Sequence, residues 1–221
     1  MTVSLDDFES GAPGSRLSAS QLARRERVID AAYDLLTTMP YERVQMREVS
    51  EESGVAVATV YRYFKSKELL FAHVLVRWVN RFGSRVQNRP VRGLTNEDRL
   101  VEVFTRAIRA FQRMPQFFSA FQVVETCADP EARELIRQLA VETHDIYASA
   151  LVGVDSETVA DIMLVSDAVM NQLLRSWTLG HIDIDQVYRA MERSIRLLVR
   201  TAEASRSADS GRVLPQLARG D

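Results

Sequence analysis

The sequence predicts an all-α protein, and three observations support this. Between residues 18 and 207, apolar side chains recur at steps of three and four residues. The alternating apolar and polar pattern that is typical of strands does not appear. Prolines and glycines interrupt the periodicity at intervals that suit helices of ordinary length, at Pro90, Gly93, Pro115, Pro130, Gly153 and Gly180.

The first helix is expected to start at Ser18 or Ser20, either of which can cap it, and to end at about Thr38. Two short helices are expected next, separated by a turn at Ser53-Gly54-Val55-Ala56. The two short helices and those that follow are expected at 46–53, 57–64, 67–89, 96–113, 116–127, 130–150, 156–179 and 184–204. The segments 1–17 and 208–221 lack this periodicity and contain glycine and proline, so we expect two flexible tails.

The composition argues against several classes of protein. Cys127 is the only cysteine, so no disulfide can form within the chain, and a reducing cytoplasm is the expected location. The polar N-terminus does not resemble a secretion signal, and no apolar run approaches the roughly 20 residues that span a bilayer, so no membrane partner is expected. The histidines at 73, 144 and 181 are isolated, and no phosphate-binding glycine loop or nucleophile motif appears. We therefore expect no enzyme, no catalytic or metal site and no cofactor.

Residues 46–64 have the pattern of a helix-turn-helix. Such a motif needs a bracing helix, a tight turn that usually contains glycine, and a second helix that is presented to the major groove of DNA. Gly54 can adopt the positive φ of the turn, and four apolar residues can pack beneath the motif, namely Val49, Val55, Val60 and Phe64. From spacing alone, an ordinary pair of helices joined by a glycine turn is an equally good interpretation. The net charge of −2 favours neither interpretation.

If the motif binds DNA, its second helix has a defined outer face. The residues left for this face and its edges are Val57, Ala58, Thr59, Tyr61, Arg62 and Tyr63. Small side chains allow close approach to the groove, whereas hydroxyl and guanidinium groups can reach phosphates and base edges. The basic run at Arg24, Arg25 and Arg27 in the first helix can either approach the flanking backbone or form a solvated face.

The stretch from Val44 to Leu70 closely resembles the DNA-binding signature of the TetR family, in particular VQMREVS followed by GVAVATVYRYFKSKELL. This resemblance implies an all-helical dimer with an N-terminal three-helix reader and a variable effector domain. It also implies that Thr59, Tyr61, Tyr63 and Lys67 hold phosphates, while Arg47 and Val57 lie at or near bases. Gln45 and Ala56 depart from the family pattern, because Ser or Thr often caps the helices there. The full set of expected DNA-binding residues is Gln45, Arg47, Val57, Ala58, Thr59, Tyr61, Arg62, Tyr63 and Lys67.

Within that family, the sequence is similar to the actinobacterial repressors of cholesterol catabolism. The similarity rests on the reader, on the segment from Val165 to Trp177, and on Arg196-Leu197-Leu198-Val199. It implies a steroid or its acyl-CoA thioester as the effector.

Aromatic and methionine residues accumulate after residue 100. At helical spacing such residues belong to a core more often than to a pocket, but their number also suits a large apolar cavity. Asp167 and Asn171 lie one turn apart on an otherwise apolar helix, and their partners can belong to the pocket or to a second subunit. The expected ligand-binding residues are Phe104, Phe111, Phe117, Phe121, Met163, Asp167, Met170, Asn171 and Trp177.

The last two helices are expected to build a homodimer through an intersubunit four-helix bundle, as the resemblance implies. The apolar residues assigned to this interface are Leu173, Leu174, Val187, Met191, Ile195 and Leu198. The alternative is that both stripes face the core of one chain.

These expectations divide the chain into a tail (1–17), a helix-turn-helix domain (18–66), an effector-binding and dimerisation domain (67–207) and a second tail (208–221). The expected function is a transcriptional repressor that a large apolar effector, a steroid or a steroid acyl-CoA, releases from a palindromic double-stranded DNA operator. Two alternatives remain: a TetR-type regulator that responds to a fatty acyl-CoA or a drug-like ligand, and a helical ligand-binding protein or hydrolase that does not bind DNA.

Overall fold

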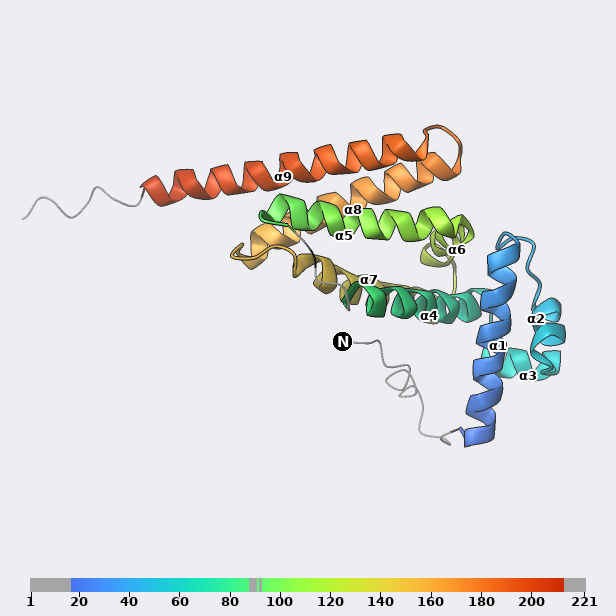
Figure 1. Cartoon of the computed structure of the whole chain (residues 1–221). Helices are drawn as coiled ribbons and strands as arrows, with labels where there is room; N and C mark the ends of the chain where they lie inside the picture. Colours follow the sequence, from blue (N-terminus) through green and yellow to red (C-terminus); the bar gives the residue numbers. More distant parts are fainter. Residues whose placement is uncertain (1–16, 88–90, 92, 213–221) are drawn as a thin grey trace, which may run out of the picture. The chain divides into compact units, whose positions relative to one another are not determined.

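The computed structural model describes residues 17–87, 91 and 93–212, so nearly all of the N-terminal tail and the last part of the C-terminal one lie outside the described residues. Across these ranges the protein is all-helical with no strand, which confirms the predicted fold class. The helices in Figure 1 are α1 (Ala19–Thr38), α2 (Met46–Ser53), α3 (Val57–Tyr63), α4 (Lys67–Gln87), α5 (Asn96–Arg113), α6 (Pro115–Glu125), α7 (Pro130–Ala148), α8 (Ser156–Thr178) and α9 (Ile184–Arg212). None of these helices is long and apolar enough to cross a membrane.

The chain divides into two compact units. The first unit comprises Met1–Pro90 and Ala110–Thr143, and the second comprises Val91–Arg109 and His144–Asp221. The three N-terminal helices therefore belong to the same packed unit as α4 and α6, and residue 66 is not a boundary of packing. The division of function at that residue stays a prediction.

The first unit has one continuous apolar core. The α1 helix begins at Ser18, whose side chain accepts a hydrogen bond from the Gln21 backbone N–H, and its apolar face buries Ile29 and Leu36 completely. The α4 helix supplies a second fully buried row that includes Leu70 and Phe71. Each such side chain contributes about 1.5–3 kcal/mol of stability when it leaves water. Residues of α6 and α7 complete the cluster, namely Phe117, Ala120, Val124, Ala132, Leu135, Ile136 and Leu139.

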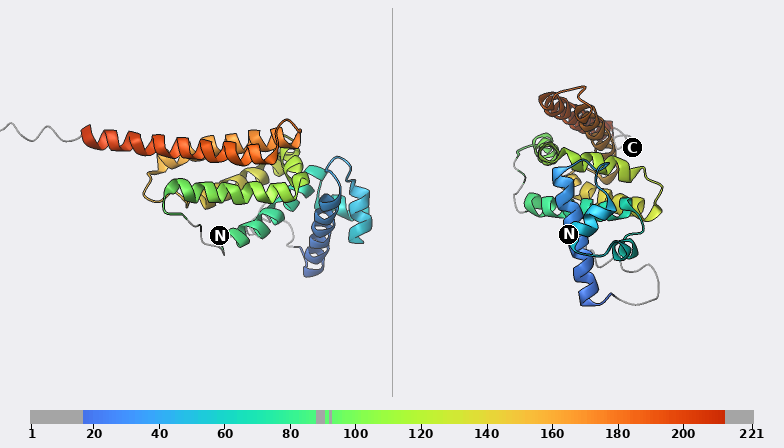
Figure 2. Two further views of the ribbon diagram at one scale, coloured as in Figure 1. Left: turned by 45° about the horizontal axis from the view of Figure 1, so that its top comes forward. Right: turned by 90° about the vertical axis from the view of Figure 1, so that its right-hand side faces the viewer.

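The second unit is built on an antiparallel pair, α8 and α9, which Figures 1 and 2 show side by side. Asp155 caps α8 by accepting a hydrogen bond from the Thr158 backbone N–H at 2.9 Å, and Gly180, with φ of 73°, lies in the turn between the two helices. The facing sides of α8 and α9 bury mainly apolar side chains, namely Ile162, Met163, Met170, Leu174, Val187, Met191, Ile195 and Val199.

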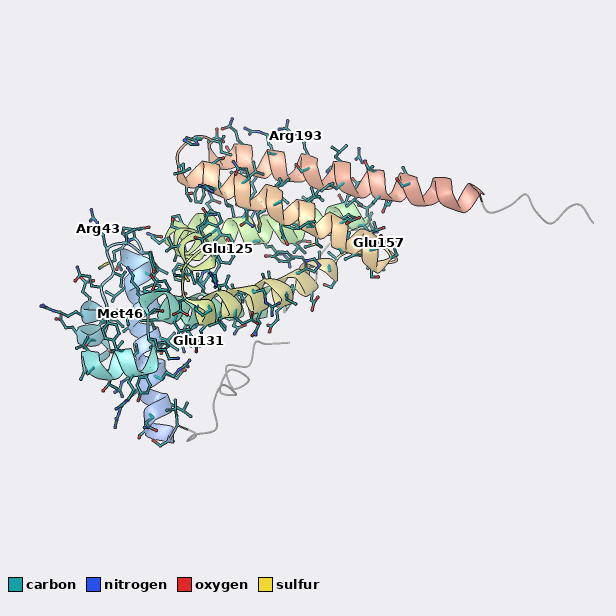
Figure 3. The ribbon with its side chains drawn as sticks, turned by 180° about the vertical axis from the view of Figure 1, so that it is seen from behind. Arg43, Met46, Glu125, Glu131, Glu157 and Arg193 are labelled. Atoms are coloured by element: carbon teal, nitrogen blue, oxygen red, sulfur yellow. The ribbon has the colours of Figure 1, made fainter. Side chains whose placement is uncertain are left out.

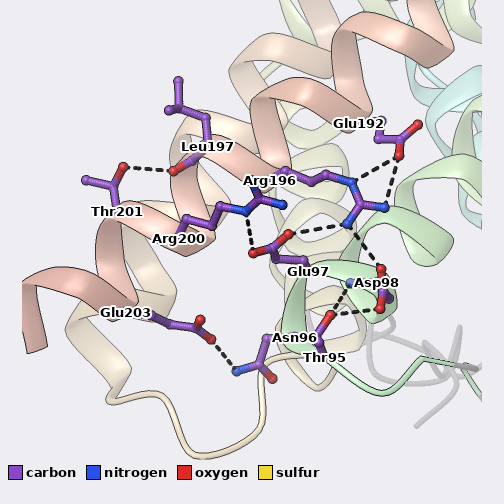
Figure 4. A network of polar contacts seen from close by, with 10 residues as sticks. All are labelled: Thr95, Asn96, Glu97, Asp98, Glu192, Arg196, Leu197, Arg200, Thr201 and Glu203. Carbon is purple, nitrogen blue, oxygen red and sulfur yellow. Dashed lines mark hydrogen bonds and ion pairs between the residues drawn. The ribbon is translucent and has the colours of Figure 1, made fainter. Parts of the chain in front are cut away.

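A network of polar contacts connects the start of α5 to α9 within the second unit (Figure 4). The Glu97 carboxylate accepts hydrogen bonds from Arg200 Nε at 2.9 Å and from Arg196 Nη1 at 3.3 Å. Arg196 also pairs with Asp98 at 3.1 Å. Because the Glu97 side chain is only 13% exposed, we expect these pairs to hold α5 more firmly than surface ion pairs do.

The observed helices agree with the predicted ones except near the ends. The α9 helix continues to Arg212 rather than ending near residue 204, so residues 208–212 are helical and not part of a tail. The stretch from Ser205 to Arg212 carries no large apolar residue, so hydrophobic periodicity gave no signal there.

Candidate nucleic-acid interface and effector region

The turn between α2 and α3 has the geometry that the helix-turn-helix pattern predicts. Gly54 lies in the left-handed region at φ 64° and ψ 24°, where a residue with a Cβ is strained. The Ser50 hydroxyl donates a hydrogen bond to the Val55 carbonyl at 2.7 Å, and the Val55 N–H donates to the Ser50 carbonyl at 3.2 Å. Both contacts fix the direction in which the chain enters α3.

The inner face of the motif is anchored as predicted. Val49, Val60 and Phe64 are fully buried, and Val55 is 4% exposed. All four belong to the core cluster of the first unit, so α3 is held on one side only.

The outer face of α3 is open to solvent. Val57 is 42% exposed and Tyr61 is 49% exposed; Ala58 and Arg62 are also exposed, and Thr59 is half-buried. Gln45 and Arg47 at the start of α2 are exposed as well, and Arg47 pairs with Glu51 one turn later at 3.0 Å. An ion pair this exposed contributes little, so the guanidinium remains available to a phosphate or a base.

The Tyr63 side chain differs from the expectation that it holds a phosphate. Its hydroxyl is buried and has no hydrogen-bond partner in the described part of the chain, while the Arg62 guanidinium lies 5.7 Å from the centre of its ring. In this conformation the hydroxyl cannot reach a phosphate, because it points away from solvent.

Lys67 is the last of the expected phosphate contacts, and its amine contacts another residue of the protein instead of facing solvent. Its Nζ donates a hydrogen bond to the Tyr41 carbonyl at 2.5 Å and lies 4.0 Å from the centre of the Tyr41 ring. Burial lowers the pKa of this amine below its ordinary value. The Tyr41 hydroxyl in turn donates to Glu68 at 3.3 Å. A phosphate contact would require Lys67 to leave this cluster.

The two unusual capping positions behave differently. The Gln45 backbone N–H donates to the Glu48 carboxylate at 2.9 Å, which supplies half of a capping box. Ala56 provides no side-chain cap, and only its carbonyl bonds to the first turn of α3, accepting from the Thr59 N–H at 2.7 Å. The expected weakness is therefore confined to α3.

Sequence reasoning missed a buried polar pair between α1 and α4. Arg25 turns inward and its Nη2 donates to His73 Nε2 at 2.9 Å, whereas Arg24 and Arg27 stay exposed. His73 is 5% exposed, and burial, together with the nearby charges of Arg25 and Arg77, lowers its pKa to about 3. The His73 side chain is therefore a neutral part of the core and not a ligand or a general base.

A second contact that the sequence did not predict joins the starts of two helices. The Ser66 hydroxyl accepts from the Leu69 N–H at 3.0 Å, which caps α4, and donates to the Asp129 carboxylate. Asp129 caps α7 by accepting from the Glu131 and Ala132 N–H groups. An Asp before a Pro is a recognisable start of a helix, but its partner 63 residues away is not visible in sequence.

The expected ligand-binding residues fall into the two units. Phe111, Phe117 and Phe121 belong to the first, where Trp78 lies 4.8 Å from Phe111 and 5.3 Å from Phe117 between ring centres. The others belong to the second unit, namely Phe104, Met163, Asp167, Met170, Asn171 and Trp177. Of these, Phe104 and Met163 are fully buried, and Asp167 and Asn171 are half-buried.

Four of the residues assigned to the dimer interface are buried within a single chain. Leu174, Val187 and Ile195 are 0% exposed and Met191 is 2% exposed. Leu173 and Leu198 are half-buried. The four buried residues therefore fit the alternative interpretation, in which the apolar stripes face the core of one chain. A dimer interface on α8 and α9 would then use the exposed sides of these helices.

Comparisons with known proteins agree with this arrangement. Residues 28–74 match the family model for bacterial regulatory proteins of the tetR family, and residues 93–198 match a tetracyclin repressor-like C-terminal domain. The chain is 30% identical over 200 residues to the HTH-type transcriptional repressor KstR of Rhodococcus jostii, covering 90% of this chain and 89% of the relative. The chain belongs to the TetR family.

Solved structures of TetR-type regulators share this fold. A TetR transcriptional regulator from Rhodococcus sp. RHA1 superimposes with a TM-score of 0.70 at 26% identity, covering 81% of this chain and 97% of that one. FadR from Bacillus subtilis, solved in complex with stearoyl-CoA, has a TM-score of 0.56 at 19% identity and covers 79% of this chain and 97% of that one. The second likeness concerns the fold alone.

Family membership decides the general activity. The protein is a DNA-binding transcriptional repressor of the TetR type and not an enzyme. The α2–turn–α3 segment lies within the matched N-terminal region, and it is the helix-turn-helix of this regulator.

Proposed function

We propose that this repressor binds a palindromic operator as a homodimer and that a large apolar effector, a steroid or its acyl-CoA thioester, releases it. The observation that carries the proposal is the one-sided anchoring of α3, whose inner face is buried while Val57, Ala58, Tyr61 and Arg62 face outward. The resemblance to repressors of cholesterol catabolism and the 30% identity to KstR support the choice of effector.

The outward residues suit two kinds of DNA contact. Val57 and Ala58 at the start of α3 are small enough to let the helix approach base edges, where a thymine methyl group can pack against them. Tyr61 and Arg62, one turn later, can donate to phosphates. Affinity should therefore fall steeply with salt, because each phosphate contact releases counterions.

Fluorescence anisotropy with a labelled operator tests these assignments. Tyr61→Phe removes one hydroxyl and should weaken binding to every sequence by a similar factor. Val57→Ala should instead change the preference between operator variants. Glu125→Gln, at an exposed position on α6, is the control. Parental affinity and specificity in both α3 variants would refute the proposed reader face.

Tyr63→Phe and Lys67→Met examine the two side chains that are turned inward. If DNA draws the Tyr63 hydroxyl out to a phosphate, Tyr63→Phe will bind more weakly than the parent. If the hydroxyl stays buried, the same variant will bind equally well. Lys67→Met keeps much of the apolar contact with Tyr41 but removes the charge, so weaker binding with unchanged folding supports a phosphate contact.

The outer sides of α8 and α9 are our proposed dimer surface. They expose Leu164 (70%), Val165 (41%) and Leu197 (69%), which are large apolar side chains without cover in one chain. A two-fold axis at the exposed Ala168 would place Asp161 of α8 opposite the partner's Arg175, because each lies seven residues from it. Figure 3 labels Glu157, at the start of α8, and Arg193, on α9; both side chains are exposed.

Sedimentation of two matched leucine variants tests that surface. Leu164→Asp should shift the protein towards monomer, because it buries a charge in the proposed interface. Leu94→Asp changes a leucine of the second unit that is 99% exposed and should leave the parental state. If Asp161→Arg weakens the dimer, adding Arg175→Asp should restore it. A parental sedimentation profile for Leu164→Asp would rule this surface out.

Release from the operator tests the effector. We expect a steroid acid or its CoA thioester to displace the protein, while free CoA at the same concentration does not. Stearoyl-CoA is the second candidate, because it is the ligand in the fold-related FadR complex. Displacement by stearoyl-CoA alone would replace the steroid assignment with a fatty acyl one. Displacement by neither would leave a DNA-binding repressor with an effector of another class.

A further inference from the structure

Four polar side chains of the second unit make no hydrogen bond to another described residue. These are the Asp167 carboxyl and the Ser166 hydroxyl on α8, and the His144 imidazole and Tyr147 phenol near the end of α7. Ser166 is 0% exposed, Tyr147 is 6% exposed, and the other two are half-buried. Buried polar groups in proteins are nearly always paired, but among the described residues of this cluster the Ser166 hydroxyl is fully buried and has no partner.

The cluster is surrounded by large apolar side chains. The Tyr147 ring packs against Phe104 of α5 with ring centres 5.1 Å apart. On α8, Asp167 shares a helical stripe with Met163 and Met170, four residues before it and three after it, which are 0% and 8% exposed. Asp167 therefore interrupts an apolar surface to which α5, α8 and the end of α7 contribute.

Electrostatics agree with this placement. Burial raises the pKa of Asp167 to about 6, although the nearby His144 acts in the opposite direction. Burial and the charge of Asp167 also raise the pKa of the Tyr147 phenol. The carboxylate thus interacts with the phenol, and the effect of burial outweighs that of His144, which disfavours the ionised form of Asp167 in the protein alone. Such groups are candidates for a binding site.

We propose that Asp167 and Tyr147 bind a hydroxyl group on an uncharged, otherwise apolar part of the effector. Tyr147 donates its phenolic proton to the oxygen of that hydroxyl, and Asp167 accepts the hydroxyl proton. The inference rests on the proposed function, because it assigns the polar contact within the effector region of the same regulator.

The inventory of donors and acceptors favours a hydroxyl over a cation. One hydroxyl needs one acceptor and one donor, which Asp167 and Tyr147 supply together. A buried ammonium needs up to three acceptors, and removing its charge from water costs free energy that these contacts must offset. Asp167 is a single half-buried carboxyl, so it supplies too few acceptors for such a cation.

Matched ligands make the proposal testable on the intact protein. One set is a hydroxysteroid, the same steroid without the hydroxyl, and its amino analogue; the second is a long-chain alcohol, the matching alkane and the amine. Binding is measured by calorimetry for the parent, Asp167→Ala, Tyr147→Phe and Asp145→Ala, an exposed carboxylate on α7 that serves as the control. We expect the alcohol to bind at least about tenfold more tightly than its unsubstituted analogue in the parent and the control. That preference should disappear in the other two variants.

The remaining outcomes contradict the proposal. An equal preference in Asp167→Ala, tighter binding of the amine, or no binding of either alcohol would each overturn it. Thermal unfolding without ligand gives a second check: Asp167→Ala should unfold no earlier than the parent, because the carboxyl makes no hydrogen bond to another described residue and the cost of its burial outweighs the attraction of His144. Earlier unfolding would indicate a structural role. Operator binding and its release by the acyl-CoA panel are measured on the same samples, so a failure of the proposed repressor function is recognised separately.

Discussion

Acid should destabilise the first unit through His73. The imidazole is buried between α1 and α4, where Arg25 donates to its Nε2, and Arg77 of the same helix adds a second positive charge. Glu26 and Asp30 of α1 face this seam, but both carboxylates pair with Arg77. A protonated His73 would lose the bond from Arg25 and would lie beside two like charges.

The pKa of His73 gives both the sign and the size of the effect. Its folded value of about 3 lies below the ordinary 6.5, so the unfolded chain binds more protons between these values. Stability from this group is therefore present above pH 6.5 and is lost as the pH falls towards 3. Between about pH 7.5 and pH 5 the loss works out at about 2 kcal/mol, since each unit below the unfolded pKa costs about 1.4 kcal/mol.

Urea unfolding at the two pH values measures this difference. His73→Gln keeps a hydrogen-bond acceptor for Arg25 but does not titrate, so it should lose about 2 kcal/mol less than the parent between about pH 7.5 and pH 5. His181→Gln, an exposed histidine of the second unit, is the control and should follow the parent. The same acid sensitivity in His73→Gln as in the parent would show that other groups are responsible and that the reasoning about the seam is wrong.

Substitutions at three further positions should act through backbone strain, capping and charge. Gly54→Ala should destabilise the protein by about 1–2 kcal/mol, because the φ of 64° is strained for alanine although no atom lies within 4 Å of the new Cβ. Gly54→Asn should cost less, because asparagine tolerates the left-handed region better. Equal denaturation midpoints for the parent and both variants would contradict this. Asp129→Ala removes the cap of α7 and the partner of Ser66, so the unfolding free energy should fall by about 1–2 kcal/mol, and an unchanged value would show that the shared cap is not formed. Glu97→Gln should lower it by about 1 kcal/mol at low salt and less at high salt, whereas a salt-independent loss would point to packing instead.

The fold was predictable because its signals are local. Helix starts and ends follow from caps, prolines and glycines, and the periodicity identifies the buried face of α3 through Val60 and Phe64. The end of α9 was not predictable, since the stretch before Arg212 carries no large apolar residue. The division into packed units was also missed, because it depends on which distant helices meet.

The candidate site was predictable in residue type but not in side-chain state. Tyr61 and Val57 are exposed on α3, and the family resemblance singled both out. The inward turn of Lys67 to the Tyr41 carbonyl depends on a contact across 26 residues, which no local pattern encodes. The assignment of Val187 to a dimer interface stays a prediction, because an apolar stripe does not say whether it faces its own chain or a second copy.

Some buried polar side chains of this protein have hydrogen-bond partners within the chain, and others do not. In the first unit, Arg25 bonds to His73 and Ser66 bonds to Asp129, so the framework of the reader is satisfied by its own residues. Two buried hydroxyls among the described residues have no partner, and they lie in different places: Tyr63 on the DNA-reading helix, and Ser166 beside Asp167 in the effector region. Unpaired buried groups cost free energy, and they occur at the two sites where the proposed function requires an external molecule. If DNA and effector each satisfy one of these sites, amide hydrogen exchange should slow around Tyr63 only with operator and around Ser166 only with effector.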